Sequence, residues 1–385
     1  MSDLTSADQV MIQRMLSKSA APLTVDNSIA VFCQGDDKLL RLLQDIRGAK
    51  RSIYLQYFII RNDPTSKILL HSLEQQAAAG LDVRVLCDGL GSLRLPDNFF
   101  RRLRKAGGLA ATYAPPWRFL HRLNYRNHRK ICVLDESIGY VGGFNLGDEY
   151  AGRPEKFSEW RDLHLRIEGS AVDSLLAWFR HDWQTAMGQP MLGSTMRETV
   201  HGGNVSIQIV ASGPETPWQP VKAGMLKMIT SATEHIYLET PYFIPDASLL
   251  EALRMAALSG VVVKVIIPGQ PDHPFVLPAG LSFIGDLLPA GVQFYLYQSG
   301  FLHSKMLTVD GAISTVGSAN FDLRSFRLDY EVNAFIYDQR IASELEQVFR
   351  ADLARSRELT LDEYNRRSSW QRAKSAFARR LAPLL

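Results

Sequence analysis

The sequence predicts an α/β protein of two similar domains that arose by internal duplication, each a mixed sheet flanked by helices, with the active site at the domain interface. Three observations lead to this prediction. One motif of polar and glycine residues occurs twice at identical internal spacing, and the strands and helices around both copies follow the same order. A length of 385 residues, 46% of them hydrophobic, is also enough for two cores.

The repeated motif has the pattern H-x-K, four residues, D, six residues, G-[GS]-x-N. This many fixed residues at matching spacing are too specific to recur by chance in one chain. The two copies carry His128, Lys130, Asp135, Gly142, Gly143 and Asn145 in the first half, and His303, Lys305, Asp310, Gly317, Ser318 and Asn320 in the second.

Each copy is predicted to form a hairpin with its chemistry at one end. Alternate side chains of a strand share a face, so His128 and Lys130 point the same way, as do His303 and Lys305. The Asp lies at the turn, and the second strand returns to the small residues and the Asn. The small residues would let the backbone and a bound anion approach closely. Each hairpin therefore presents an acid-base or nucleophilic imidazole beside two phosphate-binding donors.

The paired motif resembles the signature of the phospholipase D superfamily, and its flanks are similar to those of bacterial cardiolipin synthases. The similarity extends from about residue 28 to the C-terminus. The segments that carry it most clearly are 124–130, 142–150, 160–169 and 320–333. The resemblance implies two phospholipase D-like domains.

The same resemblance implies a role for each imidazole. His128 is expected to be the nucleophile, and His303 the acid that protonates the leaving group and then the base. A carboxylate should hold the other nitrogen of each ring, and the pattern of the family points to Asp162 for His128 and to Glu331 for His303. Both carboxylates would then belong to the half of the histidine that they hold.

The remaining motif residues divide into donors and structural residues. The ammonium and carboxamide groups are expected to stabilise charge on the phosphate oxygens, in place of the metal of many phosphoryl-transfer sites. No other His, Asp or Glu cluster has metal-ligand spacing, so neither a metal nor a cofactor is predicted. The expected donors are Lys130, Asn145, Lys305 and Asn320, and the expected turn anchors are Asp135 and Asp310.

By resemblance, the expected reaction transfers a phosphatidyl group between two phosphatidylglycerol molecules, giving cardiolipin and glycerol through a phosphohistidine. Water competes as acceptor, so a phospholipase D-type hydrolase or another phosphatidyltransferase is the nearest alternative. A nuclease of the superfamily would use the basic stretches of the chain. Apolar residues interleaved at 117–123 disfavour that nucleic-acid partner. A catalytically silent scaffold is disfavoured because no motif residue is missing from either half.

Four segments are predicted: an N-terminal extension at 1–27, a first domain at 28–200, a second at 201–357 and a basic amphipathic tail at 358–385. The extension should form a surface helix or a loose arm. In the first domain, strands at 53–60 and 83–88 flank a helix at about 65–79 that ends at Gly80. Segments 207–210, 221–232 and 236–244 repeat this order, which indicates mainly parallel strands.

Basic and apolar residues gather at two places that bear on a lipid substrate. Residues 101–130 hold nine Lys or Arg and no acid. Within this stretch, residues 113–123 are expected to form either an ordinary loop or a rim of the site that contacts acyl chains. Residues 275–284 are similarly apolar and would form the opposing rim. In the tail, Trp370, Ala373, Phe377 and Leu381 recur at helical spacing among six basic residues. The tail should pack on its own domain; alternatively it forms an interfacial basic helix on anionic lipid.

The three cysteines, Cys33, Cys87 and Cys132, are too scattered for a disulfide framework, and the last two should be buried in strands. No signal peptide or membrane-spanning run is visible in the sequence. Typical cardiolipin synthases of bacteria begin with two transmembrane helices, so this form is expected to attach peripherally or to lack its anchor. The expected location is the bacterial cell membrane, and the expected partners are phosphatidylglycerol and an anionic membrane surface.

Overall fold

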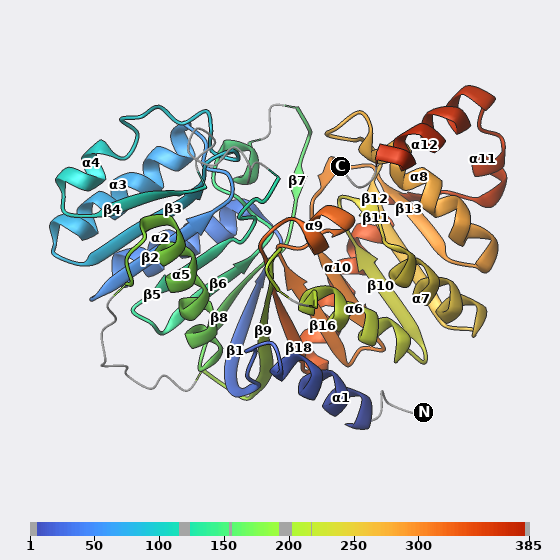
Figure 1. Ribbon diagram of the computed structural model, residues 1–385, viewed down its shortest axis with the longest axis horizontal. Helices are drawn as coiled ribbons and strands as arrows, with labels where there is room; N and C mark the ends of the chain where they lie inside the picture. The colour runs from blue at the N-terminus through green and yellow to red at the C-terminus, as the bar shows by residue number, and fades with distance from the viewer. Residues whose placement is uncertain (1–5, 115–123, 154–155, 192–201, 217, 382–385) are drawn as a thin grey trace.

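In the computed structural model, the described residues are 6–114, 124–153, 156–191, 202–216 and 218–381. Among them, fifteen strands form one continuous sheet that crosses both halves of the chain (Figure 1). The order is β19-β13-β12-β10-β15-β16-β18-β9-β1-β8-β6-β5-β2-β3-β4. The two predicted domains therefore share a sheet, and each half supplies its own side of it.

The first half contains strands β1 to β8 and helices α2 to α5. Its strands are Thr24–Phe32 (β1), Ser52–Tyr57 (β2), Asp82–Asp88 (β3), Leu109–Tyr113 (β4), Ile131–Leu134 (β5), Ile138–Gly142 (β6), Trp160–Arg161 (β7) and His164–Glu168 (β8). Its helices are Gly35–Gly48 (α2), Pro64–Ala78 (α3), Arg101–Lys105 (α4), Ala171–Met187 (α5) and the 3₁₀ turn Asp148–Tyr150 (η2).

The second half contains strands β9 to β19 and helices α6 to α10. Its strands are Val205–Ser212 (β9), His235–Glu239 (β10), Phe243–Ile244 (β11), Val262–Pro268 (β12), Gln293–Tyr297 (β13), Phe301–Leu302 (β14), Met306–Val309 (β15), Ile313–Gly317 (β16), Phe321–Asp322 (β17), Glu331–Tyr337 (β18) and Ser356–Glu358 (β19). Its helices are Pro220–Thr230 (α6), Ala247–Leu258 (α7), Val276–Leu287 (α8), Leu323–Arg327 (α9), Gln339–Ala354 (α10) and the 3₁₀ turn Leu288–Ala290 (η3).

The strand order is a palindrome about the β1–β9 pair. Reading outward, β8, β6, β5, β2, β3 and β4 on one side correspond to β18, β16, β15, β10, β12 and β13 on the other. β1 and β9 pair antiparallel, as expected where a pseudo-twofold axis passes between them. The duplication inferred from the repeated motif is thus present in the topology.

The expectation of mainly parallel strands holds only for the outer part of each half. β2, β3 and β4 are parallel, as are β10, β12 and β13, because helices return the chain between them. The central strands are antiparallel, since each motif is itself a hairpin and β8, β1, β9 and β18 continue its pattern. The expectation of mainly parallel strands is therefore wrong for the middle of the sheet, whereas the predicted mixed sheet is confirmed.

Local sequence signals set the ends of several helices. Helix α3 begins where the Asp63 carboxylate accepts a hydrogen bond from the Ser66 amide, with Pro64 as its first residue. It ends before Gly80, whose φ is 93°, so the predicted C-terminal glycine is confirmed. Gly260 has the same φ after α7, at the equivalent position of the second half.

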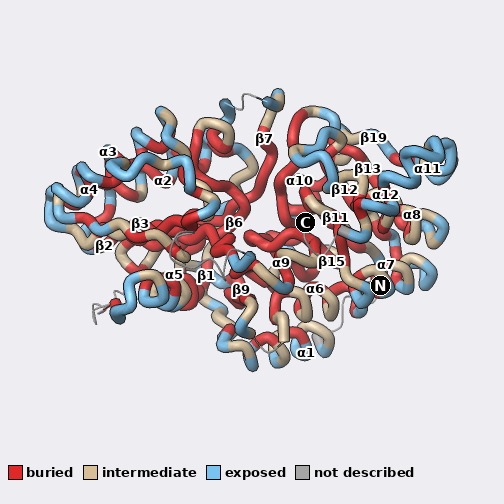
Figure 2. The backbone as a smooth tube through the Cα atoms, turned by 45° about the horizontal axis from the view of Figure 1, so that its top comes forward, coloured by how far each residue is buried: buried red, intermediate tan, exposed pale blue. Residues whose placement is uncertain are grey.

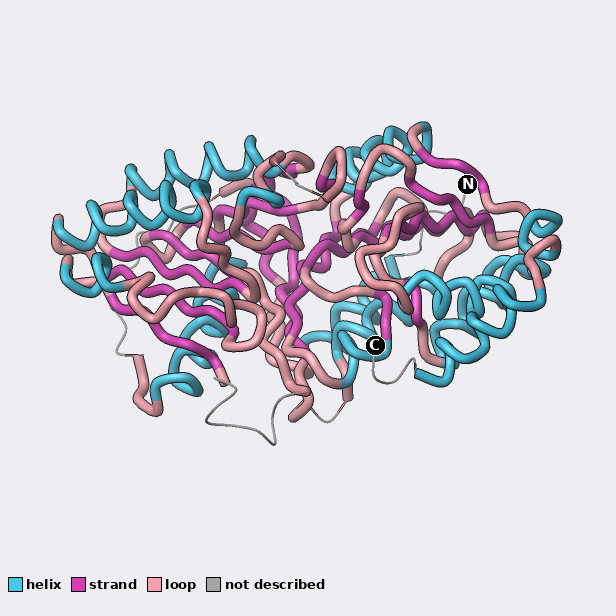
Figure 3. The backbone as a smooth tube through the Cα atoms, turned by 90° about the horizontal axis from the view of Figure 1, so that it is seen from above, coloured by secondary structure: helices cyan, strands magenta, loops and turns pink. Residues whose placement is uncertain are grey.

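Helices cover both faces of the sheet, and the sheet itself is the most buried layer (Figures 2 and 3). The strands of the two halves meet in the middle of the molecule rather than at a loose linker. One hydrophobic cluster combines side chains of both halves, including Ile167, Ile209 and Val332. Cys87 and Cys132 are buried in strands, as predicted.

The N-terminal extension forms a helix, one of the two expected alternatives, and not a loose arm. Helix α1 (Ser6–Ser17) buries Ile12 and Leu16 against the second half, where they join the cluster of Val221 and Met225 from α6. The first strand, β1, already begins at Thr24. The N-terminal helix therefore belongs to the core of the second half, a contact between segments that are about two hundred residues apart.

The tail forms two helices, α11 (Leu361–Asn365) and α12 (Ser369–Leu381), and α12 packs on its own domain, as expected. It does so through another face than the one that carries Trp370 and Phe377. α12 packs on α8 through the small side chains of Ser375 and Ala378. Arg379 adds an ion pair with Asp286 of α8 at 2.7 Å. Small residues allow the two helices to approach closely, so the large aromatic side chains of α12 point outward instead.

Candidate active site

The two motif hairpins enter the sheet at equivalent positions. The first is β5–β6 and the second β15–β16. β5 pairs antiparallel with β2, and β15 with β10, so each His-x-Lys segment lies at the carboxyl end of a parallel strand. In both halves this is the edge where α/β proteins commonly bind ligands.

Each motif histidine is held by a carboxylate of the opposite half. His128 Nδ1 lies 3.0 Å from Glu331 Oε1, and His303 Nδ1 lies 2.6 Å from Asp162 Oδ2. The pairing expected from the family, Asp162 with His128 and Glu331 with His303, is therefore wrong. The carboxylates themselves were correctly identified, and both are completely buried.

The crossing follows from how the chain segments run side by side at the domain interface. The His128 amide donates to the carbonyl of Tyr330, the residue before Glu331. In the same way the His303 amide donates to the carbonyl of Arg161, the residue before Asp162, at 2.6 Å. Each histidine is thus hydrogen-bonded through its backbone to the residue that precedes the carboxylate of the other half.

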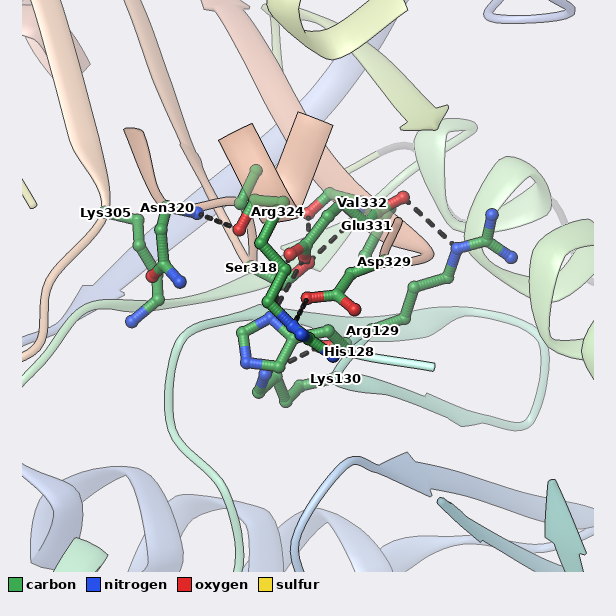
Figure 4. A network of polar contacts seen from close by, with 12 residues as sticks. His128, Arg129, Lys130, Lys305, Ser318, Asn320, Arg324, Asp329, Glu331 and Val332 are labelled. Carbon is green, nitrogen blue, oxygen red and sulfur yellow. Dashed lines mark hydrogen bonds and ion pairs between the residues drawn. The ribbon is translucent and has the colours of Figure 1, made fainter. Parts of the chain in front are cut away.

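The lysines lie beside the two rings, and Asn320 lies on the same side as Lys305. Lys130 Nζ donates to the His128 carbonyl at 2.6 Å, and Lys305 Nζ lies 2.8 Å from His303 Nδ1. Figure 4 shows Lys305 and Asn320 of the second half facing His128 and Lys130 of the first. The histidines and lysines of the two halves therefore lie close together, as the duplication predicted.

Burial determines the charge states of these groups. It lowers the pKa of His128 and of His303 to about 4. Repulsion from the lysines lowers these pKa values as well, and the attraction of the carboxylates, which raises them, only partly offsets the two effects. It also lowers the pKa of Lys130 to about 7 and that of Lys305 to about 8. Two neutral imidazoles and two readily titrating ammonium groups therefore face the site.

The carboxylates stay ionised in spite of their burial. Burial alone would raise the pKa of Asp162, but Lys305 and His303 hold it below its usual range. The pKa of Glu331 is likewise held low by His128 and Lys130, together with the hydroxyl of Ser318. A buried, ionised carboxylate accepts a hydrogen bond from Nδ1–H and so leaves the lone pair of the ring on Nε2.

The small residues of the motif serve the carboxylates rather than an anion alone. A Cβ at Gly143 would lie 2.0 Å from Oδ1 of Asp162, so a side chain at this position would displace the carboxylate. At the equivalent position of the second half, the Ser318 hydroxyl donates to Glu331. The shorter carboxylate is thus paired with glycine and the longer one with serine.

The motif aspartates lie at the far ends of their strands. The Asp135 carboxylate accepts backbone hydrogen bonds from residues 50–52 at 2.7 to 3.0 Å. Asp310 does the same for residues 233–235 at 2.7 to 2.9 Å. Both have positive φ at their turns, 50° and 51°. These contacts support the role of turn anchors that was expected for both residues.

Two buried ion pairs beneath the site were missed in the sequence. Asp182 accepts hydrogen bonds from Arg129 at 2.7 Å and from Gln56 at 2.6 Å. Asp352, at the equivalent position of the second half, binds Arg161 of the first half at 2.8 Å. The signal was present in the sequence, because the closing helices share the pattern Phe-Arg-x-Asp.

Aromatic rings form the sides of the site next to the histidines. The ring of Phe58 lies 5.0 Å from that of His128, and the ring of Trp160 lies 5.0 Å from that of His303. Most of the expected rim at 113–123 lies outside the described residues, although Tyr113 itself is buried. Most of the opposing segment, 275–284, forms helix α8 with a buried face, and Phe275 before it is exposed.

Comparison with known protein families gives a match over most of the chain. The family described as "Cardiolipin synthase, PLD-like domain" matches residues 42–183 and 225–353. The cardiolipin synthase of Listeria innocua is 46% identical over 380 residues, which are 97% of this chain and 79% of that protein. The major cardiolipin synthase ClsA of Bacillus subtilis is 48% identical, with the same coverage of both chains.

Solved structures show the same fold at low sequence identity. The crystal structure of phosphatidylserine synthase from Haemophilus influenzae has a TM-score of 0.76 and 16% identity, and the match covers 97% of this chain and 100% of that chain. Polyphosphate kinase from Porphyromonas gingivalis has a TM-score of 0.55 and 14% identity, over 85% of this chain and 50% of that chain. These likenesses concern the fold.

Proposed function

Because the chain belongs to the cardiolipin synthase family of phospholipase D-like proteins, a family of phosphatidyltransferases, we propose that it makes cardiolipin from two phosphatidylglycerol molecules. The observation that carries the proposal is the crossed pair of buried imidazole–carboxylate contacts, with a lysine beside each of them. Such a site supplies a nucleophile, an acid and charge stabilisation from its own side chains.

In the first step, Nε2 of His128 attacks the phosphorus of one phosphatidylglycerol. Glu331 accepts a hydrogen bond from Nδ1–H, which makes the ring a stronger nucleophile and stabilises its positive charge as the P–N bond forms. The P–O bond to the glycerol headgroup breaks, and His303 gives its proton to the leaving oxygen. The phosphate anion favours this step, because a negative charge beside His303 raises the pKa of the ring.

In the second step, a hydroxyl of the other phosphatidylglycerol attacks the phosphohistidine. His303, now neutral, takes the proton of this hydroxyl while the P–N bond breaks and His128 is restored. Lys130, Lys305 and the two motif asparagines stabilise the charge on the phosphate oxygens in both steps. The energy of the first ester is kept in the P–N bond, so no nucleotide is required.

Hydrolysis is the nearest competing activity of the same site. If water replaces the second alcohol, the intermediate gives phosphatidic acid instead of cardiolipin. The family match favours transfer over hydrolysis, because the matched relatives are named for cardiolipin synthesis. A nucleic-acid substrate has no comparable support.

We also propose that the chain works as a peripheral protein at an anionic membrane surface. In the described part of the chain, no helix combines the length and hydropathy needed to cross a bilayer. Helix α12 exposes Trp370 and Phe377, by 77% and 57%, beside the exposed Arg372, Lys374 and Arg380. Exposed aromatic rings among basic side chains are typical of helices that lie on anionic lipid.

Product analysis tests the proposed reaction. The protein is incubated with phosphatidylglycerol vesicles in the presence of EDTA, and the lipids are identified by mass spectrometry. We expect cardiolipin and glycerol in equal amounts, with activity lost in His128→Ala. Phosphatidic acid as the main product would show a hydrolase, and loss of activity with EDTA that a divalent metal restores would contradict the metal-free mechanism.

A further inference from the structure

Two loops that rise from the catalytic edge of the sheet carry exposed apolar side chains. The first follows β3 and exposes Leu90 and Leu93, by 41% and 56%. The second follows β12 and exposes Phe275, by 41%. β3 and β12 are equivalent strands of the two halves, so the loops flank the site from opposite sides of the pseudo-twofold axis. We call these three residues the rim tips.

The strand register places the rim tips at the same end of the sheet as the motif histidines. β3 is parallel to β2, and β12 is parallel to β10, while β5 and β15 begin opposite the carboxyl ends of β2 and β10. His128 and His303 precede β5 and β15 by a few residues. The carboxyl ends of β3 and β12, and hence both loops, therefore lie beside the site.

The first loop is held directly against the residues around His128. Asp88 at its base accepts hydrogen bonds from the amides of Leu90 and Asn127 at 2.8 and 2.9 Å. The Ser92 hydroxyl donates to the carbonyl of Phe58 at 3.1 Å, and the ring of Phe58 contacts that of His128. The two leucines are therefore presented by an anchored loop that rests on the wall of the site.

The second loop is anchored in a similar way. The hydroxyl of Tyr242 donates to Asp272 in this loop, and Tyr242 lies in the segment that follows β10. Lys156, an exposed cation from the segment before β7, donates to the carbonyl of Asp272 at 3.1 Å. Arg94 is the matching exposed cation on the first loop. Each loop thus combines apolar tips with a nearby positive charge.

We infer that the rim tips dock the catalytic edge of the protein onto a bilayer of anionic phospholipid, so that lipid headgroups enter the site directly from the membrane. This inference rests on the proposed function, because a lipid with two acyl chains stays in the bilayer while its phosphate reaches the histidines. Isolated exposed apolar residues need no explanation. Here they are placed at equivalent loops around one site, next to positive charges that complement the anionic surface.

The chain offers a matched control at the opposite end of the sheet. Leu109 and Val262 are the first residues of β4 and β12, and Leu258 ends the helix before β12. All three are exposed to an extent similar to that of the rim tips. The test compares a rim variant (Leu90→Ser, Leu93→Ser, Phe275→Ser) with a control variant (Leu109→Ser, Leu258→Ser, Val262→Ser).

Each protein is assayed on phosphatidylglycerol vesicles and on short-chain phosphatidylglycerol below its critical micelle concentration. For the rim variant we expect vesicle binding, and the ratio of vesicle to monomer activity, to fall at least about tenfold, since buried apolar area sets interfacial affinity. The control variant should resemble the wild type in both. Equal loss in both variants, or an unchanged ratio in the rim variant, would overturn the inference.

A second measurement does not depend on the triple variant being stable. Leu93→Trp should add a fluorescence signal that shifts to the blue on addition of phosphatidylglycerol vesicles, whereas the signal added by Leu109→Trp should not shift. A shift in both, or in neither, contradicts docking through the rim. A wild type that binds vesicles through the rim but forms no cardiolipin would instead contradict the proposed reaction and leave the docking surface in place.

Discussion

The crossed carboxylates make a sharp prediction about which amide substitution disables which histidine. Glu331→Gln should behave like loss of His128, and Asp162→Asn like loss of His303. In each case the amide oxygen keeps the donor that already binds the carboxylate. This donor is the hydroxyl of Ser318 for Glu331 and the amide of Leu163, at 2.8 Å, for Asp162. The new NH₂ group then faces Nδ1 of the imidazole.

An NH₂ group that faces Nδ1 reverses the tautomer of the ring. Nδ1 must become the acceptor, so the proton moves to Nε2, the atom that attacks phosphorus or exchanges the proton. A hydrogen bond to a charged group contributes about 1.5–3 kcal/mol, which corresponds to about 10- to 150-fold in rate. The wrong tautomer adds to this, and an analogous change in serine proteases costs about 10⁴-fold. We therefore expect turnover to fall by about 10²- to 10⁴-fold in each variant.

A donor with a good leaving group, such as a p-nitrophenyl phosphodiester, separates the two variants. Such a donor needs no acid, so Asp162→Asn should still form the covalent adduct and accumulate it, because its base for the second step is disabled. Glu331→Gln should form the adduct slowly or not at all. The adduct is trapped in alkali and located by peptide mass spectrometry, with His128→Ala and His303→Ala as references.

The opposite pattern would refute part of the reasoning in a defined way. If Asp162→Asn abolishes the adduct while Glu331→Gln accumulates it on residue 303, the crossed contacts hold but the nucleophile is His303. If Asp162→Asn abolishes an adduct that still forms on residue 128 in Glu331→Gln, the functional pairing is not the crossed one. Circular dichroism confirms that each variant is folded.

Three further predictions follow from the charges and contacts of the site. The pH profile of kcat/KM should pass through a maximum near pH 4, where His128 has lost its inhibitory proton while His303 still holds the proton that it donates. It should fall further between about pH 7 and 8 as Lys130 and Lys305 lose their charge, and a profile that is flat from pH 5 to pH 9 would contradict these assignments. Asp310→Ala should lower the free energy of unfolding, measured by denaturant titration, by about 1–3 kcal/mol, because three backbone amides lose their acceptor. The folded variant should keep its activity. A loss of activity without a loss of stability would place Asp310 in the chemistry. Arg161→Met should lower the free energy of unfolding by about 3–5 kcal/mol, because the Asp352 carboxylate stays buried without its partner. Adding Asp352→Asn to this variant should recover part of the lost stability.

The sequence by itself determined the motif residues of the site and the duplicated fold, whereas the two carboxylates were inferred from the resemblance to the family. The motif residues and the fold rest on local patterns, because a two-residue period brings His128 and Lys130 onto one face and the spacing to Asn145 is that of a short hairpin. The repeated strand–helix order similarly indicated two equivalent halves. These features depend on contacts within a few tens of residues, so the order of the residues is enough to predict them.

Only the tertiary structure decided which carboxylate holds which histidine and which face of the tail is exposed. Glu331 is 203 residues from His128, and Asp162 is 141 from His303, so no local period relates them. Both choices depend on docking. The halves meet about a pseudo-twofold axis that sets each histidine beside the carboxylate-bearing segment of the other half, and α12 meets α8 through its small residues. An amphipathic or repeated pattern shows which residues can form an interface. Only the three-dimensional fit between distant surfaces selects the partner of each.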